Sequence, residues 1–359
     1  MATIRKREWR TAAGEERTAW VCDYFDGAGK RRLKTFKTKR AADDWLVQTR
    51  HQVSQGVHTA DSASVTVEEA AKRWLERCQA DGLEESTLKQ YRSHVAYHIV
   101  PLIGREKLSR LSMPRVEQFR DDLLSGSRSR ALAKKALSSL KSVIKEAQRR
   151  GLVAQNVSRD VQIKANGRHK KRAELGVDIP TPAEVKALLE AAPARWRPLI
   201  VTAVFTGLRA SELRGLTWDH VDFDRKLILV RQRADAWGRI GAPKSATSRR
   251  DVPMTPIVIN TLKEWKLACP KGELGLVFPN GRGHVESHAN IVNRGIGHGL
   301  HRYRHFFASW LIDQGFGPKR VQSLMGHSSI QMTFDVYGHL FPQEDDHERF
   351  AAGELALVG

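Results

Sequence analysis

The pattern of apolar and polar residues changes twice along the chain, near residues 60 and 175, and a signal for the start of a helix follows each change. Thr66 and Glu69 form the first signal, a capping box in which each side chain can bond the other residue's backbone amide. Thr181 and Glu184 form the second, with Pro182 at the first helical position. The changes divide the chain into three segments, as expected for 359 residues, because one domain usually holds roughly 100–200.

Residues 1–60 combine a strand signal with a helix signal. Residues 18–26 partly alternate polar and apolar side chains, the sequence DGAG supplies a turn, and residues 31–36 have extended character, which predicts a β-hairpin. Residues 38–55 carry apolar side chains at helical spacing and end before Gly56. The segment holds 13 lysines and arginines against 7 acidic residues. We interpret it as a small α+β domain that binds DNA.

Residues 61–163 carry helical signals and are expected to form an all-α domain. The predicted helical stretches are Ala70–Cys78, Ser86–Val100, Pro114–Leu124 and Ala131–Arg150. Six basic residues on their exposed faces could form either a solvated surface or a DNA-binding surface: Lys89, Arg92, Lys134, Lys135, Lys141 and Lys145. Residues 164–175 follow with the basic run KANGRHKKR, which we interpret as a flexible linker able to lie along a phosphate backbone.

Residues 176–359 predict a mainly α domain with a small antiparallel β-sheet. Strands are expected at residues 226–232 and 249–253, with a loop containing Gly and Ser between them. The last twenty residues have a weak helical pattern. Further helices are expected after Thr181 and at Trp196–Phe205, Ala210–Leu216, His301–Gln314 and Lys319–Met325, with a break at Gly207 between the first two of these four.

The charge of the chain favours a polyanionic partner. Lysine and arginine number 60 against 40 acidic residues, a formal net charge of +20, which makes nucleic acid the first candidate. The most apolar stretch, residues 199–205, is far shorter than the roughly 20 residues that span a bilayer, so we expect no membrane segment. The start of the chain lacks the apolar region of a secretory signal, and the three cysteines form no C-x-x-C pair. We therefore expect a reducing, cytoplasmic location without a disulfide framework or a zinc ribbon.

Several polar residues could carry chemistry, although each also has a structural interpretation. Arg209 precedes Glu212 by about one helical turn, so the two could simply form an ion pair. Tyr337, taken alone, could be a half-buried aromatic residue with a hydrogen-bonded hydroxyl. These residues gain a functional interpretation only in combination with others.

A cluster of basic residues is expected at the start of the predicted helix at 301–314. His301, Arg304 and His305 share one face of that helix and would attract a phosphate group. His298, His301 and His305 could instead suggest zinc, but the H-E-x-x-H pattern and an acidic third ligand are missing nearby in the sequence. We expect no metal site.

The order and spacing of these motifs resemble the tyrosine recombinase (phage integrase) family. The resemblance rests on an arginine after T-G-L, a lysine in a strand-turn-strand region, H-x-x-R, G-H and a tyrosine, within residues 181–341. Carried over by position, it implies a catalytic set supported by Glu212: Arg209, Lys244, His301, Arg304, His327 and Tyr337. It also implies that residues 1–60 are an arm-type DNA-binding domain, residues 61–163 a core-binding domain and residues 176–359 the catalytic domain.

Two features depart from the family pattern. The family usually reads H-D-L-R-H where this chain has H-R-Y-R-H, so a cation replaces an acidic residue. Residues 279–300 also look short for the family, which predicts a reduced or rearranged helix before His301.

The implied chemistry fits these residue types. Two guanidiniums, Arg209 and Arg304, can stabilise the negative charge that builds on the phosphate oxygens. Tyr337 must lose its proton as it attacks phosphorus, with help from His301, while Lys244 can protonate the departing 5′-oxygen. His327 would donate a hydrogen bond to a phosphate oxygen. The covalent phosphotyrosine keeps the bond energy, so neither ATP nor metal is required.

The sequence lacks the usual signs of other phosphate chemistry. A dense acidic cluster occurs near the C-terminus, at Glu344, Asp345, Asp346 and Glu348, where a solvated charge run is the expected interpretation. The sequence contains no G-x-x-x-x-G-K-[ST] phosphate loop. A metal-dependent nuclease or an ATPase is therefore disfavoured.

The resemblance predicts a site-specific DNA recombinase that integrates or excises a phage or other mobile element through a 3′-phosphotyrosine intermediate. A Xer-type dimer resolvase is an alternative, although such enzymes usually lack a module like residues 1–60. A non-catalytic DNA-binding regulator is another. The implied partners are double-stranded DNA attachment sites, DNA-bending and directionality factors, and a homotetramer in which residues 350–358 dock on a neighbour. The implied location is the nucleoid of a bacterial host.

Overall fold

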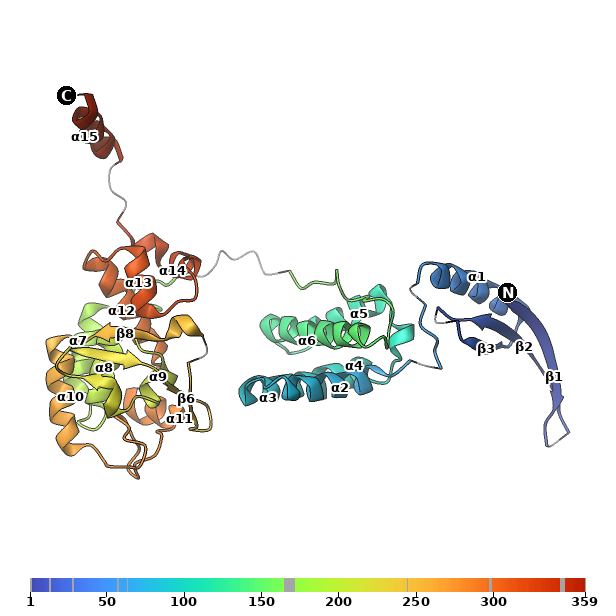
Figure 1. Cartoon of the computed structure of the whole chain (residues 1–359), viewed down its shortest axis with the longest axis horizontal. Helices are drawn as coiled ribbons and strands as arrows, with labels where there is room; N and C mark the ends of the chain where they lie inside the picture. Colours follow the sequence, from blue (N-terminus) through green and yellow to red (C-terminus); the bar gives the residue numbers. More distant parts are fainter. Residues whose placement is uncertain are drawn as a thin grey trace. The chain divides into compact units, whose positions relative to one another are not determined.

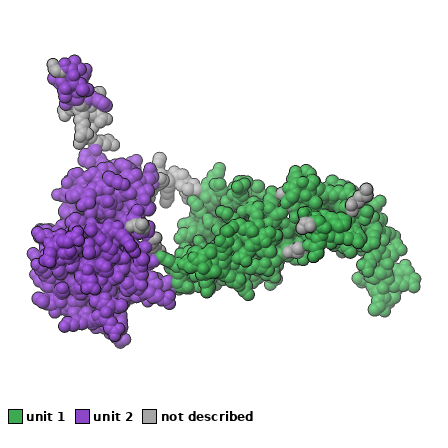
Figure 2. All heavy atoms as spheres, viewed as in Figure 1, with its two compact units in different colours: residues 1–166 green, residues 167–359 purple. Residues whose placement is uncertain are grey.

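The chain forms two compact units, residues 1–166 and residues 167–359, which Figure 2 colours separately. Among the described helices, none has both the length and the apolar character needed to cross a bilayer. In this computed structural model the described residues are 2–12, 14–27, 29–56, 58–62, 64–164, 172–243, 245–296, 299–342 and 346–358. Most of the predicted basic linker, residues 165–171, and the acidic residues Glu344 and Asp345 lie outside them.

The first unit begins with a three-stranded antiparallel sheet, ordered β1-β2-β3, and one helix packed against it (Figure 1). The strands are β1 (Thr3–Arg10), β2 (Glu16–Phe25) and β3 (Arg31–Phe36), and the helix is α1 (Lys39–Ser54). The predicted hairpin and helix are confirmed. β1 was not predicted, because its sequence TIRKREWR is mostly charged and exposed and gains its strand conformation by pairing with β2.

The rest of the first unit is helical, as predicted. Its α-helices are α2 (Val67–Ala80), α3 (Glu85–His94), α4 (Val100–Ile103), α5 (Met113–Ser125) and α6 (Arg130–Arg149). The capping box of Thr66 and Glu69 is present at the start of α2. A π-helical turn, Val95–Ile99, joins α3 to α4 just before Pro101, which has no amide hydrogen to donate to the preceding turn. The helix predicted at Ser86–Val100 therefore continues to Ile103.

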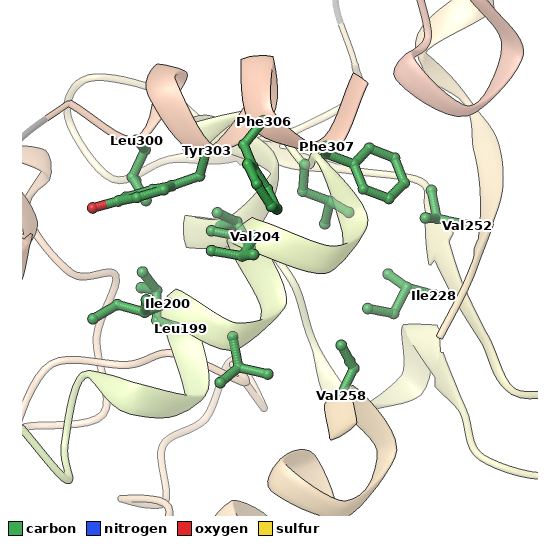
Figure 3. Packing of buried hydrophobic residues seen from close by; sticks show 14 of the residues in the cluster. Leu199, Ile200, Val204, Ile228, Val252, Val258, Leu300, Tyr303, Phe306 and Phe307 are labelled. Carbon is green, nitrogen blue, oxygen red and sulfur yellow. The ribbon is translucent and has the colours of Figure 1, made fainter. Parts of the chain in front are cut away.

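The second unit is built around a largely buried helix, α8. Its α-helices are α7 (Pro182–Ala191), α8 (Arg197–Thr206), α9 (Ala210–Arg214), α10 (Pro256–Ala268), α11 (His288–Asn290), α12 (His301–Asp313), α13 (Pro318–Met325), α14 (Ile330–Tyr337) and α15 (Asp346–Val358). α8 buries Leu199, Ile200 and Val204 against α10 and α12 (Figure 3). This burial explains why residues 199–205 are the most apolar stretch of the chain.

A small antiparallel sheet of three strands completes this core. β5 (Leu227–Val230) lies between β4 (Val221–Asp222) and β8 (Arg250–Pro253). The two predicted strands thus pair directly with each other, with Val230 opposite Arg250. The chain between them forms a second, two-stranded sheet of β6 (Arg233–Ala234) and β7 (Ile240–Gly241). The segment before α12 contains the short α11 and a π-helical turn, Ile291–Ile296, which agrees with the short segment predicted there.

Candidate active site

Arg209 is positioned by a sharp turn between α8 and α9. Gly207 ends α8 with φ +58°, and a Cβ added there would lie 2.3 Å from the ring of Phe307, so both the backbone and the packing require glycine. Arg209 then occupies the N-cap of α9. Its amide donates to Glu212 Oε2 at 2.8 Å, and its Nη1 donates to Glu212 Oε1 at 2.8 Å. The predicted ion pair with Glu212 is confirmed.

Glu212 is 3% exposed and lies between two guanidiniums. Besides Arg209, it accepts hydrogen bonds from Nη2 of Arg250 at 2.9 Å and from Nη1 at 3.1 Å. Burial acts to raise the pKa of Glu212, but the charges and hydrogen bonds of Arg250 and Arg209 outweigh it and bring the pKa below its ordinary value. The carboxylate is therefore ionised at neutral pH and fixes both arginines.

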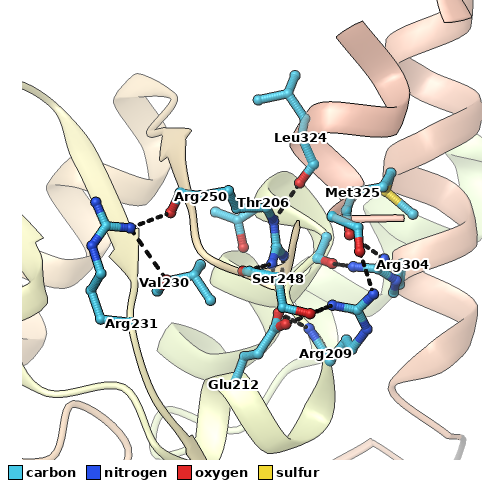
Figure 4. Close-up of polar contacts among 12 residues, drawn as sticks. Thr206, Arg209, Glu212, Val230, Arg231, Ser248, Arg250, Arg304, Leu324 and Met325 are labelled. Carbon is cyan, nitrogen blue, oxygen red and sulfur yellow. Dashed lines mark hydrogen bonds and ion pairs between the residues drawn. The ribbon is translucent and has the colours of Figure 1, made fainter. Parts of the chain in front are cut away.

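Three arginines from separate parts of the sequence meet at the C-terminal end of α13 (Figure 4). Arg250 Nε donates a hydrogen bond to the carbonyl of Leu324 at 2.6 Å. Arg304 Nη2 donates to the next carbonyl, that of Met325. Arg209 Nη2 donates to the one after it, that of Gly326, at 2.7 Å. Carbonyls at a helix C-terminus lack partners within the helix and carry partial negative charge, which suits cationic donors. The helix end thus holds the three guanidiniums in a fixed order.

Arg304 lies deepest in this cluster. It is 3% exposed, and its Nη1 also donates to the carbonyl of Gly207 at 2.5 Å. Burial and the neighbouring charges of Arg209 and Arg250 lower the pKa of Arg304 to about 9, so the guanidinium stays cationic at neutral pH. Two of the predicted site residues, Arg209 and Arg304, are therefore brought together by the fold.

The two predicted histidines lie in the field of these cations. His301 begins α12 and is exposed, yet partial desolvation of its ring by the surrounding protein, followed by the charges of Arg304 and Arg209, lowers its pKa. His327 is buried just after Gly326, with Nδ1 2.9 Å from the hydroxyl of Thr333. Burial and the same arginines lower the pKa of His327 to about 3. Its imidazole is therefore neutral at physiological pH.

Tyr337 ends α14 and is 2% exposed. Its ring is nearly parallel to that of His327, with 8° between the planes and 6.2 Å between the centroids. Burial raises the pKa of the Tyr337 hydroxyl, and the charge of Arg304 opposes this effect only in part. The tyrosine is therefore a neutral phenol inside a cationic site.

The hydroxyl of Tyr337 lies 2.8 Å from Nδ1 of His305. The family resemblance implies that His301 assists this hydroxyl, whereas in the structure His301 contacts the ring of His305, with 4.7 Å between the centroids. His305 shares the predicted helix face with His301, but the resemblance does not place it in the catalytic set.

Arg250 was not predicted to belong to the site. Its signal in the sequence is the alternation of β8, in which Arg250 and Val252 point inward and the residues between and after them are exposed. A charged residue at an inward strand position needs a buried partner, and Glu212 provides it. Ser248 was also missed; its hydroxyl lies 3.5 Å from Arg209 Nη1.

Lys244, the predicted lysine of the site, lies outside the described residues, as does His298 of the zinc alternative. Across the ranges that the structure describes, no group of three or more histidine, cysteine, aspartate or glutamate residues is arranged to hold a metal ion. The described part of the site thus consists of guanidiniums, imidazoles, one buried carboxylate and one phenol.

Comparisons with known proteins identify the family. Residues 180–344, which contain this site, match the phage integrase family model. The chain is 26% identical over 357 residues to a tyrosine recombinase XerC-like protein of Caldanaerobacter subterraneus subsp. tengcongensis, covering 89% of this chain and 91% of the relative. It is 27% identical over 365 residues to an integrase of Streptomyces ambofaciens, covering 90% of each protein.

Solved structures share the fold. The Tn1549 transposon integrase, in complex with a circular intermediate DNA, has a TM-score of 0.64 at 20% identity, over 81% of this chain and 100% of that one. A lambda integrase tetramer bound to a Holliday junction has a TM-score of 0.57 at 17% identity, over 90% and 95% of the two chains. Residues 180–344, which hold the site, therefore belong to the phage integrase family, and tyrosine recombinases and integrases are similar to the chain along most of its length.

Proposed function

We propose that this protein is a site-specific DNA recombinase of the integrase type, which cleaves and rejoins DNA strands through a 3′-phosphotyrosine intermediate. Two observations support the proposal: the buried phenol of Tyr337 lies within the field of the Arg304 charge, and the end of α13 holds the guanidinium cluster in place. Such a site can bind a phosphodiester and supply its nucleophile.

Arg209 and Arg304 are proposed to bind the nonbridging oxygens of the scissile phosphate. A guanidinium has five N–H groups, more than the two that Arg304 donates to Gly207 and Met325. Because Glu212 and backbone carbonyls orient these groups before DNA binds, little reorganisation is needed as negative charge builds up. His327, neutral and oriented by Thr333, is proposed to donate a further hydrogen bond from Nε2 to the phosphate.

In the proposed reaction the Tyr337 oxygen forms a bond to phosphorus as the bond from phosphorus to the 5′-oxygen breaks. Lys244 is proposed to give a proton to this departing oxygen, and His301 is proposed to support the proton transfers within the site. The phosphotyrosine conserves the energy of the phosphodiester bond. A 5′-hydroxyl from another strand can therefore attack it and regenerate Tyr337.

The proposed partners are double-stranded DNA attachment sites and further copies of the chain, in a homotetramer on two sites. The lambda integrase tetramer on a Holliday junction supports this proposal by analogy of fold. Residues 1–60 are proposed to bind arm-type DNA, residues 61–163 core-type DNA, and residues 164–175 to link them to the catalytic domain. DNA-bending and directionality factors are proposed as accessory partners.

The experiment uses a nicked duplex taken from the DNA flanking the gene. The nick releases the short strand that carries the 5′-hydroxyl, so the covalent protein–DNA adduct accumulates. We expect Y337F to abolish the adduct while leaving DNA binding intact. Y303F is the matched control, because Tyr303 is a buried tyrosine of the same unit, and it should still form the adduct. An adduct that persists in Y337F would refute the nucleophile assignment.

Deleting residues 1–60 separates the integrase from a Xer-type resolvase. An integrase should lose arm-site binding and integration but keep weak cleavage at the core site. A resolvase should recombine without these residues. A DNA-binding regulator without catalytic activity would form no adduct in any variant.

A further inference from the structure

Among the residues that the structure describes, His305 is the one whose side chain is hydrogen-bonded to the Tyr337 hydroxyl. Its Nδ1 lies 2.8 Å from the hydroxyl oxygen. It follows Arg304 directly on α12, and its ring lies between the hydroxyl of Tyr337 and the ring of His301. The three side chains therefore form a row that begins at the proposed nucleophile. His305 is second in this row, and His301, the predicted helper of the nucleophile, is third.

We infer that His305 is a catalytic residue that orients the Tyr337 hydroxyl and accepts its proton as the oxygen attacks the phosphate. The inference rests on the proposed function, because it assigns a role in that same reaction. It adds a residue to the site that the sequence resemblance did not supply.

A proton acceptor is needed because the phenol is buried. Burial raises the pKa of Tyr337, so the hydroxyl keeps its proton at neutral pH until the attack begins. A group that removes the proton during attack must lie within hydrogen-bond reach of the hydroxyl, about 2.6–3.2 Å. His305 Nδ1 meets this requirement.

The other two histidines of the site are placed for other contacts. His327 has its Nδ1 on the hydroxyl of Thr333, and its ring is nearly parallel to that of Tyr337, with 6.2 Å between the centroids. His301 meets His305 edge to face, with 87° between the ring planes. His305 is therefore the imidazole whose nitrogen meets the reacting oxygen.

The bond between the Tyr337 oxygen and its hydrogen breaks, and the proton moves to Nδ1 of His305, which must carry its own proton on Nε2 beforehand. The oxygen forms its bond to phosphorus, and the bond from phosphorus to the 5′-oxygen breaks. The 5′-oxygen takes a proton from Lys244. In the rejoining step the proton returns from His305 to the tyrosine oxygen.

The same hydrogen bond has an opposite interpretation, in which His305 restrains the buried tyrosine and must release it before cleavage. The two interpretations predict opposite effects of removing the imidazole. A proton acceptor makes cleavage slower when it is lost, whereas a restraint makes cleavage faster.

The test measures the rate of adduct formation by the full-length chain on the nicked duplex. We expect H305A to lower the rate by about 100-fold or more, the usual contribution of general acid–base catalysis. H305N places an amide near the position of Nδ1 and keeps a hydrogen-bonding side chain there, but it cannot take up a proton. We expect it to remain at least about tenfold slower than the wild type. H220N is the matched control, since His220 bonds the Thr217 hydroxyl elsewhere in the unit, and it should cleave normally.

Replacement of Tyr337 by 3-fluorotyrosine sharpens the test, because its more acidic phenol depends less on a proton acceptor. We expect this replacement to recover most of the rate lost in H305N. A structural defect would not respond to the acidity of the phenol. Unchanged DNA binding and thermal unfolding of H305N would show that the variant is folded.

Three results would overturn the inference: cleavage by H305A as fast as the wild type or faster, a wild-type rate in H305N, or no recovery with 3-fluorotyrosine. Each of these leaves the proposed function intact as long as the wild type forms an adduct that depends on Tyr337. If the wild type forms no such adduct, the proposed function fails and this inference fails with it.

Discussion

Each unit of the molecule contains a buried glutamate that binds several arginines, and the surroundings of the two differ. Glu146 on α6 of the first unit is 6% exposed and binds Arg77 and Arg150, each at 2.7 Å, with Arg149 at 3.5 Å. Glu212 on α9 of the second unit is 3% exposed and binds Arg209 and Arg250. For both carboxylates, burial acts to raise the pKa, but the arginines outweigh it and bring the pKa below the ordinary value.

The arginines around Glu146 extend into solvent, with side chains between 29% and 59% exposed. Arg149 and Arg150 are only three and four residues from Glu146 along the chain. Arg77 lies on α2, so its ion pair with Glu146 ties the end of α6 to α2. Arg250, by contrast, is 5% exposed and is also bonded to the end of α13. The same ion-pair chemistry thus stabilises helix packing in one unit and orients buried cations in the other. Water solvates the first cluster, whereas the second depends on its protein partners.

The largest effect is expected for E212Q. Removing the negative charge leaves the buried Arg250 and the partly exposed Arg209 without their counter-charge, and the reorientation should reach the phosphate-binding groups. We expect the rate of adduct formation to fall by about 100-fold or more, as when a preorganised donor is lost. The measurement is single-turnover cleavage of the nicked duplex. E146Q is the control, and equal rates in the two variants would erase the functional contrast between the glutamates.

E146Q is expected to act on stability instead. Its arginines can remain hydrated, so we expect the free energy of unfolding of the first unit to fall by about 1–2 kcal/mol, less than for a fully buried pair. Hydrogen exchange of the α2 and α6 amides measures this loss. Amides of α12 should exchange as in the wild type. Slower cleavage by E146Q, measured with the protein folded and the DNA saturated, would show that Glu146 also serves the reaction.

The pH dependence of stability should also report on the second unit, through His327. Its pKa is about 3 in the folded chain and about 6.5 when unfolded, so the unfolded chain binds the extra proton first as the pH falls. The stabilising contribution is complete above pH 6.5 and is lost progressively towards pH 3. Between pH 7.5 and 5.5 we expect the second unit to lose about 1 kcal/mol.

Thermal unfolding of the wild type and of H327Q at both pH values tests this dependence, since the glutamine does not titrate. Between pH 7.5 and 5.5, H327Q should lose about 1 kcal/mol less free energy of unfolding than the wild type. An identical loss in the two proteins would mean that His327 does not contribute to the pH dependence.

The smallest effect on stability is expected on the exposed face of the helical part of unit 1. Arg92 pairs with Glu85, and their side chains are 46% and 44% exposed. R92A should therefore change the free energy of unfolding by less than about 0.5 kcal/mol. If this face binds the DNA backbone, the slope of log affinity against log salt should fall by about 1. An unchanged slope would favour the solvated surface that the sequence also allowed.

Much of the local structure could be predicted from the sequence. Capping boxes determined the starts of α2 and α7, because a threonine and a glutamate three residues apart satisfy each other's amides without help from distant residues. The hairpin of β2 and β3 followed from alternation and a turn. β1 escaped prediction because its charged side chains show no alternation, and the strand depends on the partner that it pairs with.

The sequence also determined which residue types the site contains, through the order of arginine, histidine and tyrosine motifs. Only the tertiary structure decided how they are held. Arg209 and Gly326 are 117 residues apart, Arg250 and Leu324 are 74, and His305 and Tyr337 are 32. The acceptors that fix the arginines are backbone carbonyls, which every residue type possesses, so no side-chain pattern can mark them. Their direction is set by the end of α13 and by the packing around it.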